Sequence, residues 1–374
     1  MAEKLTGPVL LIEGGISDSN LRYMCGFTAP DPVVYLKNGR RSFLVVSTLE
    51  AGRAGNEAMV TEVLTPQSLS VPKRHGRDVS YWSLALIRRE RLKRVVVSPY
   101  FPVAAANLLR NNGITVSVAK GPLFPGRSVK NAIEVNHIRA AQKAAVAGMR
   151  GAIEIIRSSE VGPDGFLISG KRLLTSGEIR REIETTLLQY DCIALDTIVA
   201  GGRQGADPHE RGHGPLKCGE PIVIDIFPRH RTTGYWGDIT RTVVKGEASD
   251  GLLHMYRAVK TAQRAALSMI KAGETVENIH RAVMTVFNDR GYITDSGKPV
   301  PEGFIHGTGH GIGLDIHEEP SINLSREKLR AGHVVTVEPG LYYEDMGGIR
   351  IEDTVVVTRS GWRYLATFPK TFVL

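Results

Sequence analysis

The sequence of 374 residues has little cysteine and no long apolar run. Its three cysteines, Cys25, Cys192 and Cys218, are odd in number and scattered, so no pair has the C-x-x-C spacing of a metal or redox site. Three reduced thiols are expected. No apolar stretch approaches the ~20 residues that a membrane helix needs, and the apolar run at residues 9–12 is too short for a signal peptide. We therefore expect a cytoplasmic protein with no membrane partner.

Positive charge is in surplus, with a formal net charge of +8. A basic protein can bind nucleic acid through the phosphates. The densest basic run, residues 88–94, is short and interrupted by Glu90, and no nucleic-acid-binding motif accompanies it. We interpret this run as a solvated surface and expect no nucleic-acid partner.

The length is large for one hydrophobic core, and two domains are expected. The first third has the alternating patterns of a small α/β domain: a hairpin over 33–36 and 42–46 with a turn at Asn38-Gly39, strands over 94–98 and 114–118, and a helix over 103–109. Residues 120–126 are rich in turn formers and are the best candidate linker. We predict one domain over residues 1–125 and a second over 126–374.

After the linker the pattern changes to longer helices. Apolar residues recur at helical spacing over 135–156, 179–187, 252–270 and 276–287. The second of these helices begins at a capping box formed by Thr175 and Glu178. Each pair of helices is followed by a glycine- and histidine-rich loop and then by strands. The order therefore occurs twice, which predicts two halves of similar structure.

The two halves also match residue by residue. Residues 217–225 and 330–338 each have a basic residue, a glycine two positions later and a carboxylate eight positions later. The first carboxylates are Asp225 and Glu338. Asp238 follows 13 residues after Asp225, and Glu352 follows 14 residues after Glu338. The sequence thus predicts one pair of carboxylates in each half.

All four carboxylates lie in or beside apolar strands, where an unpaired charge is costly. Arg241 and Arg350 could pair with some of them in ordinary salt bridges at the strand ends. If the two halves instead pack about a pseudo-twofold axis, four like charges meet at one centre and need strong cations such as two divalent ions. A histidine from the glycine-rich stretch 306–317 would complete an oxygen-rich set that suits manganese, iron, cobalt or zinc.

Five motifs, in order, resemble those of the pita-bread metallopeptidase family, which includes aminopeptidase P, prolidase, methionine aminopeptidase and creatinase. They are VIDI (223–226), GDITRT (237–242), HGTGHGIG (306–313), VEPGLY (337–342) and GIRIED (348–353). The resemblance covers residues 128–374. Residues 20–27 resemble the creatinase-type N-terminal domain more weakly. The resemblance implies an α+β chain whose C-terminal pita-bread domain has a pseudo-twofold repeat and follows a smaller α/β domain.

The resemblance also implies a ligand set for two divalent ions. Asp238 and Glu352 would bridge the ions, Asp225 would bind one, and His310 with Glu338 would bind the other. A water between the ions would be the nucleophile, because the ions lower its pKa. Glu338 would take its proton and pass it to the leaving nitrogen.

Three further histidines are expected at the substrate site. His306 and His317 flank His310, and in the resembling family imidazoles at these places lie near the scissile bond. His306 is a feature of the proline-directed and creatinase branches. His209 matches a family histidine ahead of the first aspartate, with His213 as a rival. A structural hydrogen bond in a loop is the plainer alternative for each.

We expect three residues that do not bind the metal themselves to orient its ligands through hydrogen bonds: Arg350, Thr240 and Tyr342. The chain departs from the family pattern in one place, where residues 226–237 are two longer than usual and Phe227 replaces a glycine. An even insertion at a hairpin turn leaves the pairing of the flanking strands intact. The basic residues 229–231 at this turn could contact substrate or a neighbouring subunit.

We therefore predict a dinuclear Xaa-Pro aminopeptidase or Xaa-Pro dipeptidase, with manganese as the first choice of metal and cobalt, zinc or iron as alternatives. The expected partner is an Xaa-Pro peptide, and a homodimer is expected from the family. Two alternatives stay open: a metal-dependent hydrolase or lyase of the same fold that acts on a small non-peptide amide or zwitterion, and a non-catalytic binding module.

Overall fold

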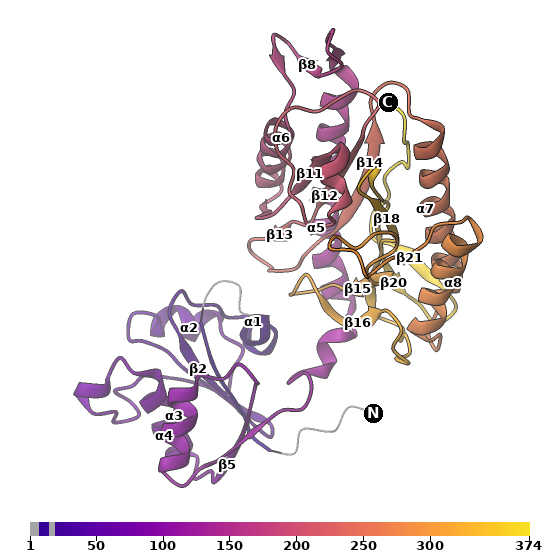
Figure 1. Ribbon diagram of the computed structural model, residues 1–374. Helices are drawn as coiled ribbons and strands as arrows, with labels where there is room; N and C mark the ends of the chain where they lie inside the picture. Colours follow the sequence, from indigo (N-terminus) through magenta and orange to yellow (C-terminus); the bar gives the residue numbers. More distant parts are fainter. Residues whose placement is uncertain (1–6, 15–18) are drawn as a thin grey trace. The chain divides into compact units, whose positions relative to one another are not determined.

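The computed structural model describes residues 7–14 and 19–374, which Figure 1 shows as a ribbon. The chain divides into two compact units, Met1–Arg127 and Ser128–Leu374. Within the described residues, no helix is both long enough and apolar enough to cross a membrane.

The N-terminal unit is built on a six-stranded sheet with the order β4-β3-β2-β1-β5-β6. The strands are β1 (Val9–Glu13), β2 (Val33–Asn38), β3 (Arg41–Val45), β4 (Glu62–Leu64), β5 (Arg94–Val97) and β6 (Thr115–Val118). The helices are α1 (Ser19–Cys25), α2 (Ala51–Glu57), α3 (Val79–Arg89) and α4 (Val103–Asn111), with 3-10 turns at Lys73–His75 and Pro125–Ser128. Strands β2 and β3 form the predicted hairpin, where Gly39 takes a positive φ of 58°. The predicted α/β pattern is confirmed.

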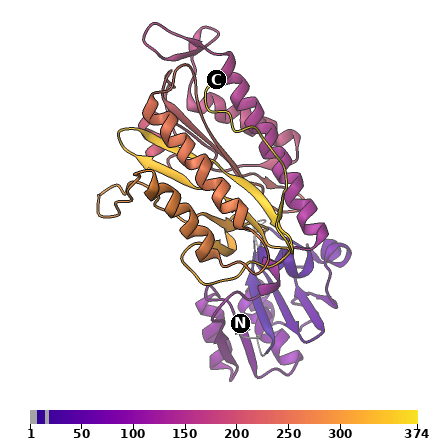
Figure 2. The ribbon, with the colours of Figure 1, turned by 90° about the vertical axis from the view of Figure 1, so that its right-hand side faces the viewer.

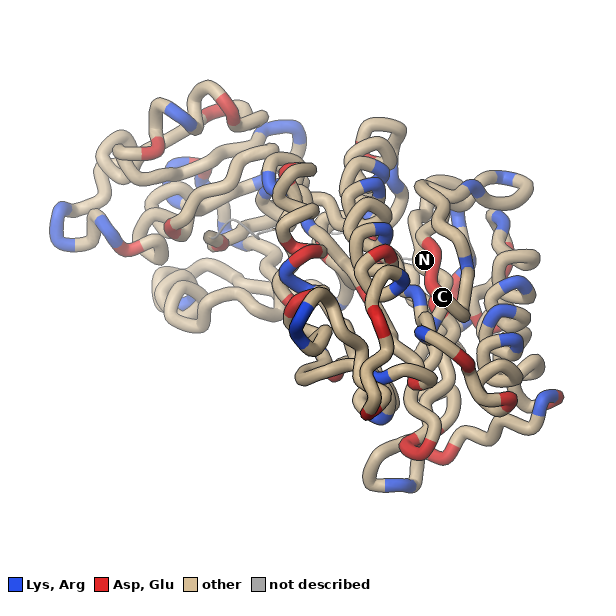
Figure 3. The backbone as a smooth tube through the Cα atoms, turned by 90° about the horizontal axis from the view of Figure 1, so that it is seen from above, with Lys and Arg blue, Asp and Glu red and all other residues tan. Residues whose placement is uncertain are grey.

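The surplus of positive charge falls entirely in the N-terminal unit. Residues 1–127 hold 17 Lys and Arg against 9 Asp and Glu, which equals the net charge of +8 for the whole chain. Basic and acidic residues are interspersed along the backbone (Figure 3). At least four of the acids are already paired, Glu90 with Arg41 at 3.0 Å, Glu62 with Arg89 at 2.7 Å, and Glu50 and Glu57 both with Arg53. The C-terminal unit, which carries the predicted site, therefore has no formal net charge.

The C-terminal unit repeats one arrangement twice. Its first half contains α5 (Ala132–Ser158), β7 (Glu160–Val161), β8 (Leu167–Ser169), β9 (Arg172–Leu173), α6 (Ser176–Gln189), β10 (Cys192–Ile193), β11 (Ile198–Gly201), a 3-10 helix (Gly202–Ala206), β12 (Pro221–Ile226), β13 (Arg229–His230) and β14 (Ile239–Val244). Its second half contains α7 (Asp250–Met269), α8 (Val276–Asp289), β15 (Gly309–Gly311), β16 (Glu318–Ile322), β17 (Val334–Val337), β18 (Gly340–Tyr343), β19 (Gly347–Arg350), β20 (Asp353–Val357) and β21 (Trp362–Tyr364). Thr175 and Glu178 form the predicted capping box of α6.

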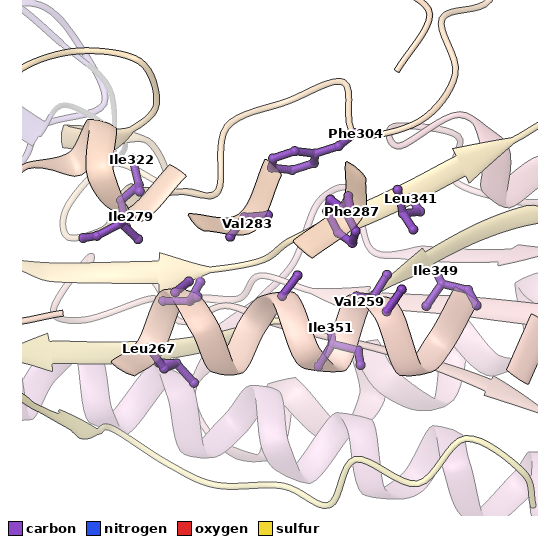
Figure 4. Packing of buried hydrophobic residues seen from close by; sticks show 14 of the residues in the cluster. Val259, Leu267, Ile279, Val283, Phe287, Phe304, Ile322, Leu341, Ile349 and Ile351 are labelled. Atoms are coloured by element: carbon purple, nitrogen blue, oxygen red, sulfur yellow. The ribbon is translucent and has the colours of Figure 1, made fainter. Parts of the chain in front are cut away.

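Each half has its own hydrophobic core. Helices α5 and α6 pack against β11, β12 and β14, and helices α7 and α8 pack against β17 to β20. In Figure 2, α5 and the pair α7 and α8 lie on different sides of the strands. Figure 4 shows part of the second core, where Val259 of α7 lies near Ile349 and Ile351, and Phe304 lies near Phe287 of α8. Burial of each such side chain contributes about 1.5–3 kcal/mol, so each core stabilises the packing of its helices on the strands.

One buried histidine of the second half makes stability depend on pH. His333 is 1% exposed, and burial, together with Lys130 and Arg330, lowers its pKa to about 4. In the unfolded chain the pKa is about 6.5, so the unfolded state binds the proton more readily as pH falls from 6.5 to 4. Keeping His333 neutral in the folded state therefore stabilises the protein fully above pH 6.5. At pH 5 the free energy of unfolding is lower by about 2 kcal/mol.

We expect His333→Asn to remove this part of the pH dependence, since asparagine can still accept the hydrogen bond that the Arg330 N–H donates to His333 Nδ1 at 3.2 Å. Urea unfolding of both proteins at pH 7 and pH 5 measures it. An identical loss of stability in both proteins would contradict this assignment.

Candidate metal centre

The four predicted carboxylates lie at the ends of strands. Asp225 lies in β12 opposite Thr240 of β14, and Asp238 directly precedes β14. In the second half, Glu338 directly follows β17 and Glu352 directly precedes β20. Asp225, Asp238 and Glu352 are buried, and the Glu338 side chain is 18% exposed. Strand ends from both halves thus bring these side chains to one place.

His310 approaches the carboxylates from strand β15. Its Nε2 lies 3.6 Å from Asp238 Oδ2 and 3.3 Å from Glu338 Oε1. Ligand atoms of His310, Asp238 and Glu352 all lie within 4.8 Å of one another. Gly309 makes this approach possible, because a Cβ there would lie 2.0 Å from the Thr336 carbonyl oxygen. His310 Nδ1 donates to the Gly311 carbonyl at 3.1 Å, which leaves Nε2 as the free donor atom for a metal.

The carboxylates raise one another's pKa. Burial raises the pKa of Asp238 well above its usual range, and the charges of Glu352, Asp225 and Glu338 raise it further. Burial and the charges of Glu338 and Asp225 do the same for Glu352. Burial also raises the pKa of Glu338. A cluster with these shifts holds protons or binds cations at neutral pH.

The salt-bridge alternative accounts for only one of the four. Arg350 pairs with Asp225 Oδ2 at 2.8 Å, whereas Arg241 pairs at 2.7 Å with Asp353, which is outside the set. In the described part of the chain, Asp238, Glu338 and Glu352 have no Lys or Arg partner. Burial lowers the pKa of His310, which keeps the imidazole neutral.

Two carboxylate oxygen atoms of the centre also lack a hydrogen-bond donor among the described residues. Asp225 Oδ1 and Glu352 Oε1 are buried and accept no hydrogen bond from any described residue. Buried polar atoms without partners are rare in proteins and call for an ion or water. Carboxylate oxygens with one imidazole are a donor set for divalent transition metals. The residues present therefore fit divalent ions better than structural ion pairs.

A chain of hydrogen bonds connects the centre to His306. Arg350 donates to the Tyr342 hydroxyl at 2.8 Å, and that hydroxyl lies 2.8 Å from His306 Nε2. His306 Nδ1 donates to the Gly307 carbonyl at 2.7 Å, so the neutral ring accepts the Tyr342 proton at Nε2. Tyr342 is fully buried, and burial raises its pKa to about 12, so it stays a donor. Thr240 donates to Glu352 Oε2 at 2.8 Å.

The remaining predicted histidines are more exposed. The His317 ring packs edge to face on His310, with ring centroids 4.4 Å apart. Burial lowers the pKa of both His306 and His317, and the nearby His209, which is exposed, lowers both further. The rival His213 lies 3.7 Å from Glu210 instead. The structure thus places His317 against His310 and His306 on the hydrogen-bond chain from Arg350, whereas the predicted place of His209 at the substrate site stays a prediction.

The sequence analysis overlooked Thr336. Its side chain is fully buried, accepts the His310 N–H at 3.0 Å and lies 3.3 Å from Glu338 Oε1, to which it donates. One hydroxyl therefore fixes both residues. The available signal was a single polar residue within the apolar run of β17.

Glu318, next to His317, was overlooked as well. Its Oε1 accepts the backbone N–H groups of Leu314 at 3.0 Å and Asp315 at 3.1 Å. Its other oxygen pairs with Lys130 at 2.8 Å, and both side chains are buried. This pair fixes the loop that leads from His310 to His317.

The longer segment between the two aspartates folds as a second hairpin. Pairing of β12 with β14 continues to Ile226 and Ile239, so the extra residues do not shift the register. Arg229 is buried, and Arg231 faces Asp191 at 3.7 Å within the same unit. After the turn of this hairpin, Trp236 donates its backbone N–H to the Gly313 carbonyl at 2.9 Å. Its indole N–H donates to the Leu314 carbonyl at 3.0 Å. The segment therefore supports the loop before His317.

The chain belongs to metallopeptidase family M24, whose family model matches residues 136–359. This confirms the expected peptidase family and the pita-bread fold. A solved structure of an Xaa-Pro dipeptidase from Bacillus anthracis has 25% sequence identity and a TM-score of 0.83 and covers 98% of this chain and 95% of that one. An X-Pro aminopeptidase from Thermotoga maritima MSB8 has 26% identity and a TM-score of 0.81, with 98% and 97% coverage.

A curated Xaa-Pro dipeptidase from Pyrococcus furiosus is 33% identical over 222 residues. That alignment spans 57% of this chain and 61% of the relative, so it covers less than two thirds of that protein. Similar proteins therefore include both dipeptidases and an aminopeptidase.

Proposed function

We propose that this protein is a metal-dependent peptidase that hydrolyses the bond before proline. The observation that carries the proposal is the set of buried carboxylates beside His310, which lacks enough protein cations to balance it. The names of its relatives supply the Xaa-Pro specificity. His306 beside the centre agrees with the proline-directed branch of the family.

The residues that would hold two divalent ions are Asp225, Asp238, His310, Glu338 and Glu352, and manganese is our first choice. When bound, such ions lower the pKa of a water molecule and supply a nucleophile at neutral pH. The assignment of residues 1–125 to a creatinase-type domain and 126–374 to the catalytic domain belongs to the same proposal. The homodimer and the cytoplasmic location also stay predictions.

The chain's own residues would handle the proton and the substrate. Glu338 is partly exposed and has a raised pKa, so it can accept a proton and return it to the leaving nitrogen. His306 carries its proton on Nδ1, and Tyr342 keeps Nε2 aligned. His317 and His209 are exposed, so both are available to contact the peptide.

Release of the N-terminal residue from an Xaa-Pro-Xaa peptide, with Mn²⁺ and with chelator, tests this function. We expect Mn²⁺-dependent cleavage, and an Xaa-Pro dipeptide tested in parallel separates dipeptidase from aminopeptidase. Protein shown to hold metal that cuts neither peptide would refute the Xaa-Pro specificity. A screen of small amides and zwitterions would then follow, because that is the remaining metal-dependent alternative.

Support of the 313–317 loop by Trp236 predicts a measurable effect on catalysis. Trp236→Phe keeps the backbone bond to Gly313 but loses the indole bond to Leu314, worth about 0.5–1.5 kcal/mol. We expect kcat/KM on the peptide to fall about 3- to 10-fold. Trp82→Phe is the matched control, because the Trp82 indole donates to the Gly76 carbonyl at 3.1 Å in the other unit. Equal kcat/KM values for the two variants would show that the Leu314 bond has no catalytic role.

A further inference from the structure

Two buried glutamines occupy matching positions on the repeated long helices. Gln142 of α5 lies in the sequence AQKAA, and Gln263 of α7 lies in AQRAA. Gln142 is 1% exposed, and Gln263 is fully buried. Glutamine is mostly an exposed residue, so two of them at matching buried positions require specific hydrogen-bond partners.

Gln142 bonds to both backbone groups of Asp238. Its Oε1 accepts the Asp238 N–H at 2.8 Å, and its Nε2 donates to the Asp238 carbonyl at 2.7 Å. Gly237 permits this contact, because a Cβ there would lie 2.5 Å from the Gln142 backbone nitrogen. One amide side chain thus fixes the backbone of a proposed metal ligand against helix α5.

Gln263 also bonds to the backbone beside the carboxylates, in the second half. Its Nε2 lies 3.0 Å from the Val337 carbonyl oxygen, 3.1 Å from the Ile351 carbonyl oxygen and 3.1 Å from Asp353 Oδ2, whereas its Oε1 accepts no hydrogen bond from any described residue. Val337 and Ile351 directly precede Glu338 and Glu352. A single amide group therefore ties together the two strand ends that carry the carboxylates of this half.

We infer that Gln142 and Gln263 are positioning residues that set the spacing of the carboxylates for metal binding, an inference that rests on the proposed metal centre. Four carboxylates in a buried site repel one another, so their backbones need a firm support. An amide gives that support without charge. A Lys or Arg at either position would instead compete with the ions for the same carboxylates.

Titration of the metal-free, full-length chain with Mn²⁺, followed by calorimetry, tests the inference. We expect Gln142→Met and Gln263→Met each to weaken Mn²⁺ affinity about 10- to 100-fold, the usual effect of losing a residue that supports a metal ligand. Gln204→Met is the matched control, because Gln204 makes the same two bonds to the backbone of His213, at 3.0 and 2.9 Å. Its Mn²⁺ affinity should equal that of the wild type.

Thermal unfolding of each metal-free variant shows that it is folded before titration. If Gln142→Met does not fold, Gln142→Asn keeps a neutral amide that is one methylene too short to bond both backbone groups of Asp238, and the same loss of affinity is expected. Folded variants with wild-type affinity would overturn this inference alone. Wild-type protein that binds no Mn²⁺ would overturn it together with the metal centre, whereas metal binding without peptide cleavage would overturn only the proposed Xaa-Pro activity.

Discussion

Glu338→Gln is expected to lower kcat on an Xaa-Pro-Xaa peptide by about 100- to 10,000-fold, the usual contribution of a general acid–base group. Glutamine has nearly the same shape and can still accept the hydrogen bond from Thr336, but it cannot take a proton. Burial raises the pKa of Glu338, which makes its carboxylate a stronger proton acceptor. KM should change little, because the loss falls on the transition state.

Glu338 is also a proposed metal ligand, so the metal content of the variant has to be measured beside its rate. Glu344→Gln makes the same chemical change at an exposed glutamate, whose partner Arg203 lies at 2.8 Å, and should leave kcat unchanged. If Glu338→Gln retains kcat within threefold of the wild type while holding metal, Glu338 is not the proton acceptor.

Asp238→Asn is expected to remove metal-dependent stabilisation while it stabilises the metal-free protein. Asp238 is 4% exposed, and its raised pKa reports burial and the repulsion of its carboxylate neighbours. A neutral isostere relieves that repulsion, so Asp238→Asn in chelator should melt at or above the wild-type temperature. Above the unfolded pKa of about 4 this repulsion costs more as pH rises, so the advantage of the variant should grow with pH.

Metal binding should raise the melting temperature of the wild type above that of Asp238→Asn. At a metal concentration 100 times Kd, a ligand stabilises the folded state by about 2.7 kcal/mol. In a domain of this size, that corresponds to a rise in Tm of about 5–11 °C. We expect this rise for the wild type and not for Asp238→Asn, in thermal melts with Mn²⁺ and with chelator. A rise of the same size in both proteins would exclude Asp238 as a ligand.

Much of the secondary structure was predictable from local patterns, whereas the ligand set was predicted from the family resemblance. Helix α5 spans Ala132–Ser158 where apolar spacing predicted residues 135–156, and the hairpin of β2 and β3 forms where Asn38-Gly39 predicted a turn. The repeat predicted a pair of carboxylates in each half. These features depend on residues close together in the chain, which is why periodicity and turn chemistry predict them.

The contacts that distinguish a metal site from salt bridges were not predictable. Both Arg241 and Arg350 were candidates for the four carboxylates, but Arg241 pairs with Asp353 instead. Gln142 is 96 residues from Asp238 and, as a polar residue in a helix, gave no sign of burial. Which partner a side chain takes depends on distances of a few ångströms between segments that are far apart in the chain. No local sequence pattern encodes these distances.

The uneven distribution of charge has a consequence for handling the protein. Residues 128–374 carry 30 Lys and Arg and 30 Asp and Glu, so the +8 of the N-terminal unit supplies all the net charge. Proteins without net charge associate and precipitate more readily, since nothing keeps the molecules apart in solution. A truncation to residues 128–374 would lack that charge, and we expect it to precipitate more readily at neutral pH than the full-length chain.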